Sequence, residues 1–382
     1  MLTALFFIPL IGALSLLFVN KNESLMKRIT LGTTILNFFI SLIIFFLGVF
    51  LYTSLDILHS FISCLFLINT SNECNILIFS LIPLMTTSNN SKSLDPDFIT
   101  GFTDAEGSFT ILITESKTCK IGWTVRARFQ IRLHSKDLPL LKEIQSFFGG
   151  IGNIYTSSKD QTATYRIEDI KSLTNVIVPH FESYSLQSAK RIDYELWEQC
   201  INLKEAEKSL TLSSLEKIIA IKGAINLGLS DKLINLFPLV KPITRPEFFV
   251  NKAKLNPHWI SGFTTGEGCF SFSINGDSIK PSFSIGLHKR DEPLLLKILE
   301  FFNSKANLYS YGAHTSVELK ISAKSDFNTF LIPHFNKYPL SGVKLYNYII
   351  WREMVELITN KAHLIPEGKV KLRELQSTLN KI

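Results

Sequence analysis

The chain has 382 residues, of which 46% are hydrophobic, and a formal net charge of +7 at pH 7. This length allows about two to four domains, and the mildly basic balance suits a nucleic-acid partner without establishing one. The five cysteines form no CxxC pair and no Cys/His cluster with zinc spacing, which argues against a structural zinc site and a disulfide framework. A mean hydropathy of +0.20 is high for a soluble enzyme and predicts that one segment of the chain is not soluble.

The first 94 residues read as a hydrophobic leader. Uncharged apolar runs cover 3–19 and 29–55, each near the length that a bilayer span needs, and they predict two transmembrane helices. A third apolar stretch at 57–85 is interrupted by polar residues and is a weaker candidate. A cleavable signal peptide is disfavoured because the positively charged n-region is missing and the second run is too long. We therefore expect a fragment of an integral membrane protein, followed by the polar linker TTSNNSKS (86–93).

The remainder of the chain repeats itself. Residues 1–94 hold only four of the 40 basic residues and three of the 33 acidic ones, so nearly all the charge lies beyond residue 94. The matching blocks are FITGFTDAEGSFTI (98–111) with WISGFTTGEGCFSF (259–272), HSKDLPLLKEIQSFF (134–148) with HKRDEPLLLKILEFF (288–302), and VPHFESYSL (178–186) with IPHFNKYPL (332–340). The offset is 161 at the first pair and 154 at the later ones. A period this long excludes a solenoid and predicts two duplicated domains with pseudo-two-fold symmetry.

Each copy predicts the same order of elements. A helix of about ten residues ends near Gly107 or Gly268, two alternating strands follow, and a further helix covers 137–148 or 291–302. Two short strands and one or two helices complete each copy, in an α+β fold of αββαββα repeats. The predicted domains are a leader at 1–94, a first repeat at 95–202, a helical linker at 203–256 and a second repeat at 257–382.

The opening helix of each copy carries a glutamate at its end. Small residues such as Gly101 and Gly262 would let the two helices pack side by side, which would bring Glu106 and Glu267 close together. Two converging carboxylates can hold hard divalent cations such as Mg²⁺, and paired metal ions can clamp the attacking and leaving oxygens of a phosphodiester. The alternative is a pair of ordinary helix C-terminal acids, which the helix dipole disfavours.

The strand at 123–134 is expected to face nucleic acid. Its apolar and polar residues alternate, so that one face packs on a core while the other carries three arginines and no acid. Arginine and glutamine read guanine and adenine edges in the major groove. The equivalent face of the second copy is polar but much less basic; an amphipathic sheet that only faces solvent is the alternative. The candidate DNA contacts are Arg126, Arg128, Gln130 and Arg132 in the first copy and Ser282, Ser284 and His288 in the second.

The paired opening motifs resemble the LAGLIDADG motif of homing endonucleases, and the repeat order and the tail at 363–382 agree with the single-chain form of that family. The resemblance implies two sheets that form a saddle over double-stranded DNA, a monomer that cuts with Mg²⁺ or another divalent cation, and metal binding by the acids at the eighth motif position, Glu106 and Glu267. The sixth position is Asp104 in the first copy but Thr265 in the second, a departure that we do not expect to abolish cleavage.

The resemblance further implies a catalytic lysine beyond the fourth strand of each repeat, whose charge would stabilise the phosphate as negative charge develops on it. Lys171 and Lys324 are the preferred candidates, although they deviate by one residue from strict repeat register. Arg166 and Lys320 are in strict register and are the rivals.

The opening MLTALFFIPLIGALSLLFV resembles the start of a mitochondrial NADH dehydrogenase (complex I) membrane subunit, with subunit 4 as the preferred candidate. A reading frame that runs from a host exon into an intron would explain such a leader. It implies a mitochondrial, intron-encoded endonuclease for a long, non-palindromic intron-insertion site, with the leader in the membrane and the processed enzyme in the matrix. The alternatives are a maturase that binds its own intron RNA, a respiratory membrane subunit and a non-catalytic DNA-binding regulator.

Overall fold

The computed structural model describes residues 93–206, 209–275, 278–311 and 315–380. Residues Ser93–Ile382 form one compact unit. The predicted leader helices lie outside the described residues. Within the described ranges, no helix is both long and apolar enough to cross a membrane. The domain limits expected at residues 94, 202 and 256 stay predictions.

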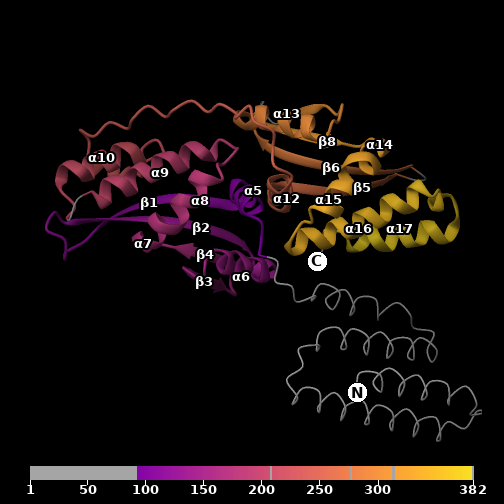
Figure 1. The fold of residues 1–382 in the computed structure, drawn as a ribbon, viewed down its shortest axis with the longest axis horizontal. Helices are drawn as coiled ribbons and strands as arrows, with labels where there is room; N and C mark the ends of the chain where they lie inside the picture. The colour runs from indigo at the N-terminus through magenta and orange to yellow at the C-terminus, as the bar shows by residue number, and fades with distance from the viewer. Residues whose placement is uncertain (1–92, 207–208, 276–277, 312–314, 381–382) are drawn as a thin grey trace, which may run out of the picture. The chain divides into compact units, whose positions relative to one another are not determined.

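The unit Ser93–Ile382 contains the same arrangement of helices and strands twice (Figure 1). The first copy comprises α5 (Pro96–Glu106), β1 (Gly107–Glu115), β2 (Trp123–His134), α6 (Leu138–Phe147), β3 (Asn153–Ser157), β4 (Thr162–Ile167), α7 (Ile170–Ser172), α8 (Val178–Ser183) and α9 (Lys190–Glu205). The connection holds α10 (Leu212–Lys222) and α11 (Asp231–Leu236). The second copy comprises α12 (Pro257–Glu267), β5 (Gly268–Asn275), β6 (Ser278–His288), α13 (Glu292–Phe301), β7 (Leu308–Tyr311), β8 (Ser316–Ile321), α14 (Lys324–Asp326), α15 (Ile332–Lys337), α16 (Gly342–Thr359) and α17 (Pro366–Thr378).

Each copy builds one antiparallel four-stranded sheet, with strand order β1-β2-β4-β3 in the first and β5-β6-β8-β7 in the second. The buried face of each strand pair is apolar at every second residue, because successive side chains of a strand point to opposite faces. The predicted α+β order and the alternation within 123–134 are therefore confirmed.

Each sheet has its own core, and both cores are organised around one phenylalanine of the first strand. Phe109 contacts aromatic rings from β2, α8 and α9, and Phe270 contacts the equivalent rings of the second copy. The rings around them are Phe129, Phe181, Tyr194 and Trp197 in the first copy and Phe283, Phe335, Tyr348 and Trp351 in the second. Aromatic pairs of this kind contribute about 0.5–1.5 kcal/mol each beyond the area they bury.

The helices α5 and α12 lie side by side and join the two copies (Figure 1). A Cβ placed on Gly101 would overlap the carbonyl oxygen of Trp259, and one placed on Gly262 would overlap that of Phe98. Only glycine at these two positions lets the backbones approach this closely.

Both helices begin and end in the same way. Asp95 and Asn256 act as N-caps, each followed by a proline at the first helical position, where a missing N–H costs nothing. At the other end, the N–H of Gly107 bonds to Thr103 and that of Gly268 to the equivalent threonine, and each glycine is also the first residue of a strand. The last helical residue is thus held at a rigid junction between helix and sheet.

We expect Gly262→Ala to lower the free energy of unfolding by about 1–3 kcal/mol, the usual cost of overpacking, because backbone atoms of Phe98 would have to move. Gly286→Ala is the matched control, since nothing lies within 4 Å of a Cβ at that strand position, and its effect should stay within about 0.5 kcal/mol. Urea denaturation measures both. Equal stabilities of the two variants would contradict the close packing of α5 against α12.

Candidate active site

Glu106 and Glu267 are the last residues of α5 and α12, and the helix pair brings them together. Glu106 packs against Gly266, with its Cγ and Oε1 3.0 Å and 3.3 Å from a Cβ built on that glycine. Both glutamates are half-buried. Burial raises the pKa of each carboxyl, and the charge of Glu106 raises the pKa of Glu267 further. The expected convergence of the two acids is therefore present.

Two lysines complete this charged cluster. The Nζ of Lys190 donates to the carbonyl oxygens of Thr103 (3.0 Å) and Ala105 (3.1 Å), which belong to the last turn of α5. The Nζ of Lys344 donates to the carbonyl of Gly268, just past the end of α12. Carbonyls at a helix C-terminus carry partial negative charge, so they attract ammonium groups. Both lysines lower the pKa values of both glutamates, while burial lowers the pKa values of the lysines themselves.

The four groups line two cavities. The first, of about 350 Å³, is lined by Glu267 together with Lys190, and the second, of about 570 Å³, is lined by Glu106 together with Lys344. Each cavity therefore combines the glutamate of one copy with the lysine of the other. Further polar groups line them at equivalent positions: His288 and Asp291 in the first cavity, His134 and Asp137 in the second.

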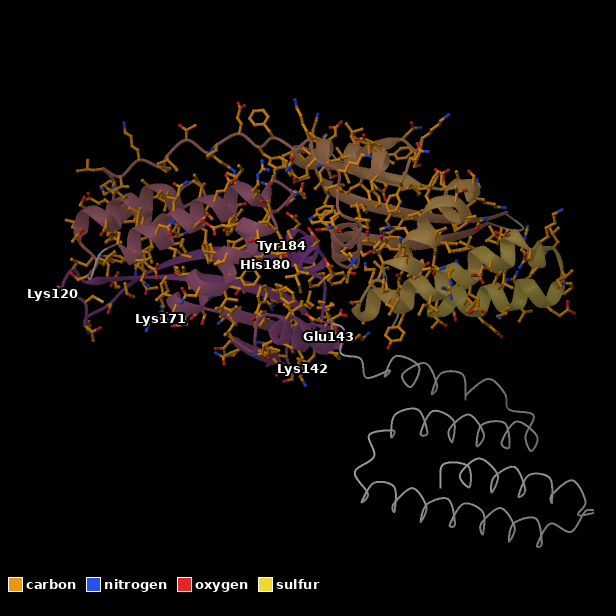
Figure 2. The ribbon with its side chains drawn as sticks, viewed as in Figure 1. Lys120, Lys142, Glu143, Lys171, His180 and Tyr184 are labelled. Carbon is orange, nitrogen blue, oxygen red and sulfur yellow. The ribbon has the colours of Figure 1, made fainter. Side chains whose placement is uncertain are left out.

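The structure does not bring Lys171 and Lys324 to this cluster. Among the described residues, the lysines that act on both glutamates are Lys190 and Lys344. Lys171 lies on α7, away from the helix pair (Figure 2), and Lys324 begins the equivalent helix α14. The rival Arg166 lies on the sheet, where it stacks on Tyr155 at 5.0 Å. Lys320 lies on β8, opposite Ser284.

Strand direction is the physical reason. β2 is antiparallel to both β1 and β4, so β4 runs parallel to β1 and leads the chain away from the glutamate end of α5. The chain returns through α8, where His180 and the carbonyl of Tyr184 bond to Thr100 of α5 (Figure 2). Helix α9 then begins with Lys190 beside the glutamates. One sequence signal could have identified this lysine: Lys190 and Lys344 are 154 residues apart, which is the repeat offset.

The outward face of β2 carries the expected basic residues and no acid of its own, but neighbouring segments place carboxylates beside two of its arginines. Arg128 forms an ion pair with Glu168, which follows β4, and Arg132 lies 3.7 Å from Asp160 in the β3–β4 turn. Arg126 is exposed and Gln130 is partly buried. Neighbouring segments supply acids that the strand itself lacks, so that two of the arginines are held in place by carboxylates.

The second sheet differs from expectation at two of three positions. Ser282 and Ser284 are only 7% exposed each. The hydroxyl of Ser282 bonds to Ser271 at 2.8 Å. His288 is exposed, but its Nδ1 accepts a hydrogen bond from the N–H of Arg290 and so caps the following turn.

Two exposed tyrosines on the outward faces were missed. Tyr155 on β3 is 51% exposed and Tyr309 on β7 is 44% exposed. They share the 154-residue offset, and through strand pairing they lie in line with Arg132 and Gly286, respectively. The sequence signal for them is a tyrosine at equivalent positions of the two copies, which the alternation of residues within one strand does not reveal.

Asp104, the acid at the sixth motif position, has a structural role. It is buried and accepts hydrogen bonds from the N–H groups of Gln187 and Ser188, the hydroxyl of Ser188 and the indole Nε1 of Trp259. Its counterpart Thr265 is also buried and bonds to the carbonyl of Ser261. The departure from the motif in the second copy therefore changes packing and leaves the glutamate pair in place.

The glutamate pair fits a divalent cation. Burial raises the pKa of both carboxyls and the charge of Glu106 raises that of Glu267 further, so a hard cation bound by the pair would favour their ionised forms. Across the described ranges, no cluster of three or more His, Cys, Asp or Glu side chains could hold a metal ion. Glu106 and Glu267 would thus be the carboxylate ligands, and the remaining oxygen ligands would come from outside the side chains of the cluster.

The family model described as LAGLIDADG endonuclease matches residues 99–201 and 260–355, which together are more than half of the chain. Probable intron-encoded endonuclease 3 of Neurospora crassa is 37% identical over 289 residues, 74% of this chain and 54% of that protein. Probable intron-encoded endonuclease 2 of the same fungus is 37% identical over 295 residues, 75% of this chain and 65% of that protein. The chain thus spans less than two thirds of the length of these relatives. A Podospora anserina protein, named as an uncharacterized 50.9 kDa protein in ND4 intron 1, is 46% identical over 122 residues, 31% of this chain and 26% of that protein.

Solved structures match over a similar share of the chain. The I-SmaMI LAGLIDADG homing endonuclease bound to cleaved DNA has a TM-score of 0.72 and 34% identity, with 75% of this chain and 97% of the solved chain covered. I-SmaMI bound to an uncleaved DNA target in the presence of calcium ions has a TM-score of 0.72 and 33% identity, with 76% and 100% covered. By its matched sequence, its two four-stranded sheets and its helix-borne glutamates, this chain belongs to the LAGLIDADG endonuclease family.

Proposed function

We propose that this chain is a site-specific homing endonuclease that hydrolyses both strands of a DNA duplex and uses Mg²⁺ or another divalent cation held by Glu106 and Glu267. The observation that carries this proposal is the pair of cavities beside one helix pair, each with one glutamate and one lysine. Two equivalent sites in one chain could each act on one of the two antiparallel strands of a DNA duplex. The two Neurospora crassa relatives are described as probable intron-encoded endonucleases, which favours cleavage over the maturase alternative.

The two sheets would bind the duplex as a saddle in a single chain, each sheet reading one half of the target. The DNA-bound structures of I-SmaMI support this arrangement. The outward faces differ at equivalent positions, for example Arg132 in the first copy and Gly286 in the second, so the two half-sites would be read with different chemistry. This asymmetry fits a non-palindromic target. Tyr155, Tyr309 and Arg166 join Arg126, Arg128, Gln130, Arg132 and His288 as candidate contacts, whereas Ser282 and Ser284 would require a close approach of the DNA to the sheet.

In the proposed mechanism, Glu106 and Glu267 would hold the divalent cation beside the scissile phosphates. A bound divalent cation supplies Lewis-acid polarisation of the phosphodiester and a lower pKa for water. Lys190 and Lys344 replace Lys171 and Lys324 as the catalytic lysines that we propose, because only the former pair lies beside the glutamates. Their ammonium groups, oriented by helix carbonyls, would stabilise negative charge as it develops on each phosphate.

We infer that residues 1–94 derive from subunit 4 of NADH dehydrogenase and that the protein is encoded in a mitochondrial intron. The relative named for ND4 intron 1 supports this assignment. Insertion of the leader into the membrane rests on its two uncharged apolar runs, and its proteolytic removal would release the endonuclease into the matrix. The boundaries that we propose remain residues 94, 202 and 256.

The endonuclease proposal predicts that the full chain and residues 93–382 linearise a plasmid that carries the intronless exon junction, with Mg²⁺ and not with EDTA. Glu106→Gln and Glu267→Gln should each lower the rate by more than about 100-fold, since even outer-shell partners of a metal site are worth about 10–100-fold. An agarose-gel assay measures the products. Absence of cleavage together with tight binding of the intron RNA would favour the maturase alternative.

The assignment of the lysines predicts that Lys190→Met and Lys344→Met each lower the single-turnover rate by about 100- to 1000-fold, the usual effect of removing one charge-stabilising donor. Lys171→Met and Lys324→Met are the matched controls and should cleave at near the parent rate. Target affinity, measured in Ca²⁺ to prevent turnover, should change little in all four variants. A larger loss in the Lys171 or Lys324 variant would restore the original assignment.

The raised carboxyl pKa values predict that Glu267→Gln stabilises the metal-free protein at about pH 8. Burial and the charge of Glu106 make the folded state bind the Glu267 proton more tightly than the unfolded chain does. Stability therefore falls as the pH rises from the ordinary carboxyl pKa to the raised one. Glutamine cannot ionise, so the variant escapes this loss.

Melting temperatures from about pH 4 to about pH 8 test this pH dependence. The gap between variant and parent should be small at the acidic end, open as the pH rises, and shrink when Ca²⁺ binds the parent. Glu300→Gln, at an exposed position of α13, is the control without such a trend. A constant difference at every pH would contradict the argument.

A further inference from the structure

Two aspartates make the same hydrogen bond in opposite directions between the two copies. Asp291, which precedes α13 of the second copy, accepts from the N–H of Ala189 in the first copy at 2.7 Å. Asp137, which precedes α6 of the first copy, accepts from the N–H of Val343 in the second copy at 2.8 Å. Both the acceptors and the donors are 154 residues apart, so the contact obeys the repeat symmetry.

Each donor amide directly precedes a lysine of the cluster. Ala189 comes before Lys190, and Val343 comes before Lys344. These amides lie at the N-termini of α9 and α16, where N–H groups lack partners within the helix and carboxylates are favoured by the dipole. In the described part of the chain, neither helix is capped by the side chain of its own N-cap residue, Ala189 or Ser341. The opposite copy supplies the acceptor for the N–H groups of Ala189 and Val343, while the N–H of Lys190 bonds to the hydroxyl of Ser188 in its own copy.

The backbone of the second copy is built to receive this cap. Gly342 has a φ of +62°, a conformation that residues with a Cβ rarely adopt, and a Cβ there would overlap the Oδ1 of Asp137. Each aspartate also lines the cavity that holds the lysine it supports: Asp291 with Lys190, and Asp137 with Lys344. The caps are therefore part of the walls of the two candidate sites.

We propose that Asp137 and Asp291 are positioning residues that act across the boundary between the copies. Asp291 orients Lys190 and Asp137 orients Lys344, so that each aspartate governs hydrolysis of one DNA strand. This proposal rests on the proposed endonuclease function. It adds a dependence that the separate copies would lack, because neither lysine is held in place by its own copy alone.

The two caps differ in their support from other residues. In the first copy, Asp104 also holds the segment before α9 through the N–H groups of Gln187 and Ser188. In the second copy, Thr265 accepts one longer bond, at 3.4 Å, from the N–H of Ser341. Loss of Asp137 should therefore displace its lysine more than loss of Asp291 does.

Strand-resolved single-turnover cleavage by the full chain tests the proposal, on the exon-junction target labelled on each strand. We expect Asp291→Ala to slow one strand and Asp137→Ala to slow the other, by about 10- to 100-fold, as for other groups that orient catalytic residues, with the larger loss for Asp137→Ala. Nicked DNA would accumulate. Asp137→Asn and Asp291→Asn should retain strand balance, because the amide oxygen still accepts the backbone N–H.

Asp169→Ala is the matched control, since Asp169 caps α7 through the N–H of Ser172 (2.9 Å) far from the lysines. It should cause no strand bias. Equal slowing of both strands by the alanine variants would overturn the proposal. Equal losses in the alanine and asparagine variants would overturn it too, because they would assign the effect to the lost charge rather than to the cap.

Amide hydrogen exchange separates this proposal from the endonuclease function. Asp291→Ala should speed exchange at the start of α9 by at least about tenfold and leave α16 unchanged, and Asp137→Ala should do the reverse. Unchanged exchange in both variants would overturn the positioning role even if cleavage occurs. If the parent cuts no DNA, the strand assignment falls with the proposed function, whereas the exchange data still decide whether the caps act across the copies.

Discussion

The backbone contact between α5 and α12 is the constraint on which the rest of this unit depends. Because Gly101 and Gly262 leave no side chain between the helices, the ends of the two helices converge and carry Glu106 and Glu267 with them. Each helix continues directly into the first strand of its sheet. The same contact therefore sets the separation of the carboxylates and the placement of the two sheets relative to each other.

Convergence of charge at this point is costly for the fold. Two carboxylates and two ammonium groups are partly withdrawn from water, and burial shifts all four pKa values toward the neutral forms. The chain offsets part of this cost by giving the ammonium groups backbone carbonyls at or just past the helix ends as acceptors. The lysine-bearing helices are themselves capped from the opposite copy. A cost of this kind is typical of functional sites rather than of residues that stabilise a fold.

Duplication explains which features agree between the copies and which have diverged. The aromatic cores, the glutamates, the lysines and the capping aspartates all recur, because each is needed to build one half of the site. The outward faces differ, as with Arg132 and Gly286, and the sixth motif position has changed from Asp104 to Thr265. Under the proposed function, a single chain can diverge in this way because its halves need not read the same DNA sequence.

The sequence by itself determined the two repeats, the ends of the motif helices, the alternating strand at 123–134 and the convergence of Glu106 and Glu267. These features depend on local spacing and on a symmetry that is visible as a 154-residue offset. Only the tertiary structure decided which lysines accompany the glutamates, because that choice depends on the direction of β4 and on the return of the chain through α8. It also decided that Glu168 pairs with Arg128 and that Ser282 is covered. These features depend on contacts between different segments of the chain, and the alternation of residues within one strand does not predict such contacts.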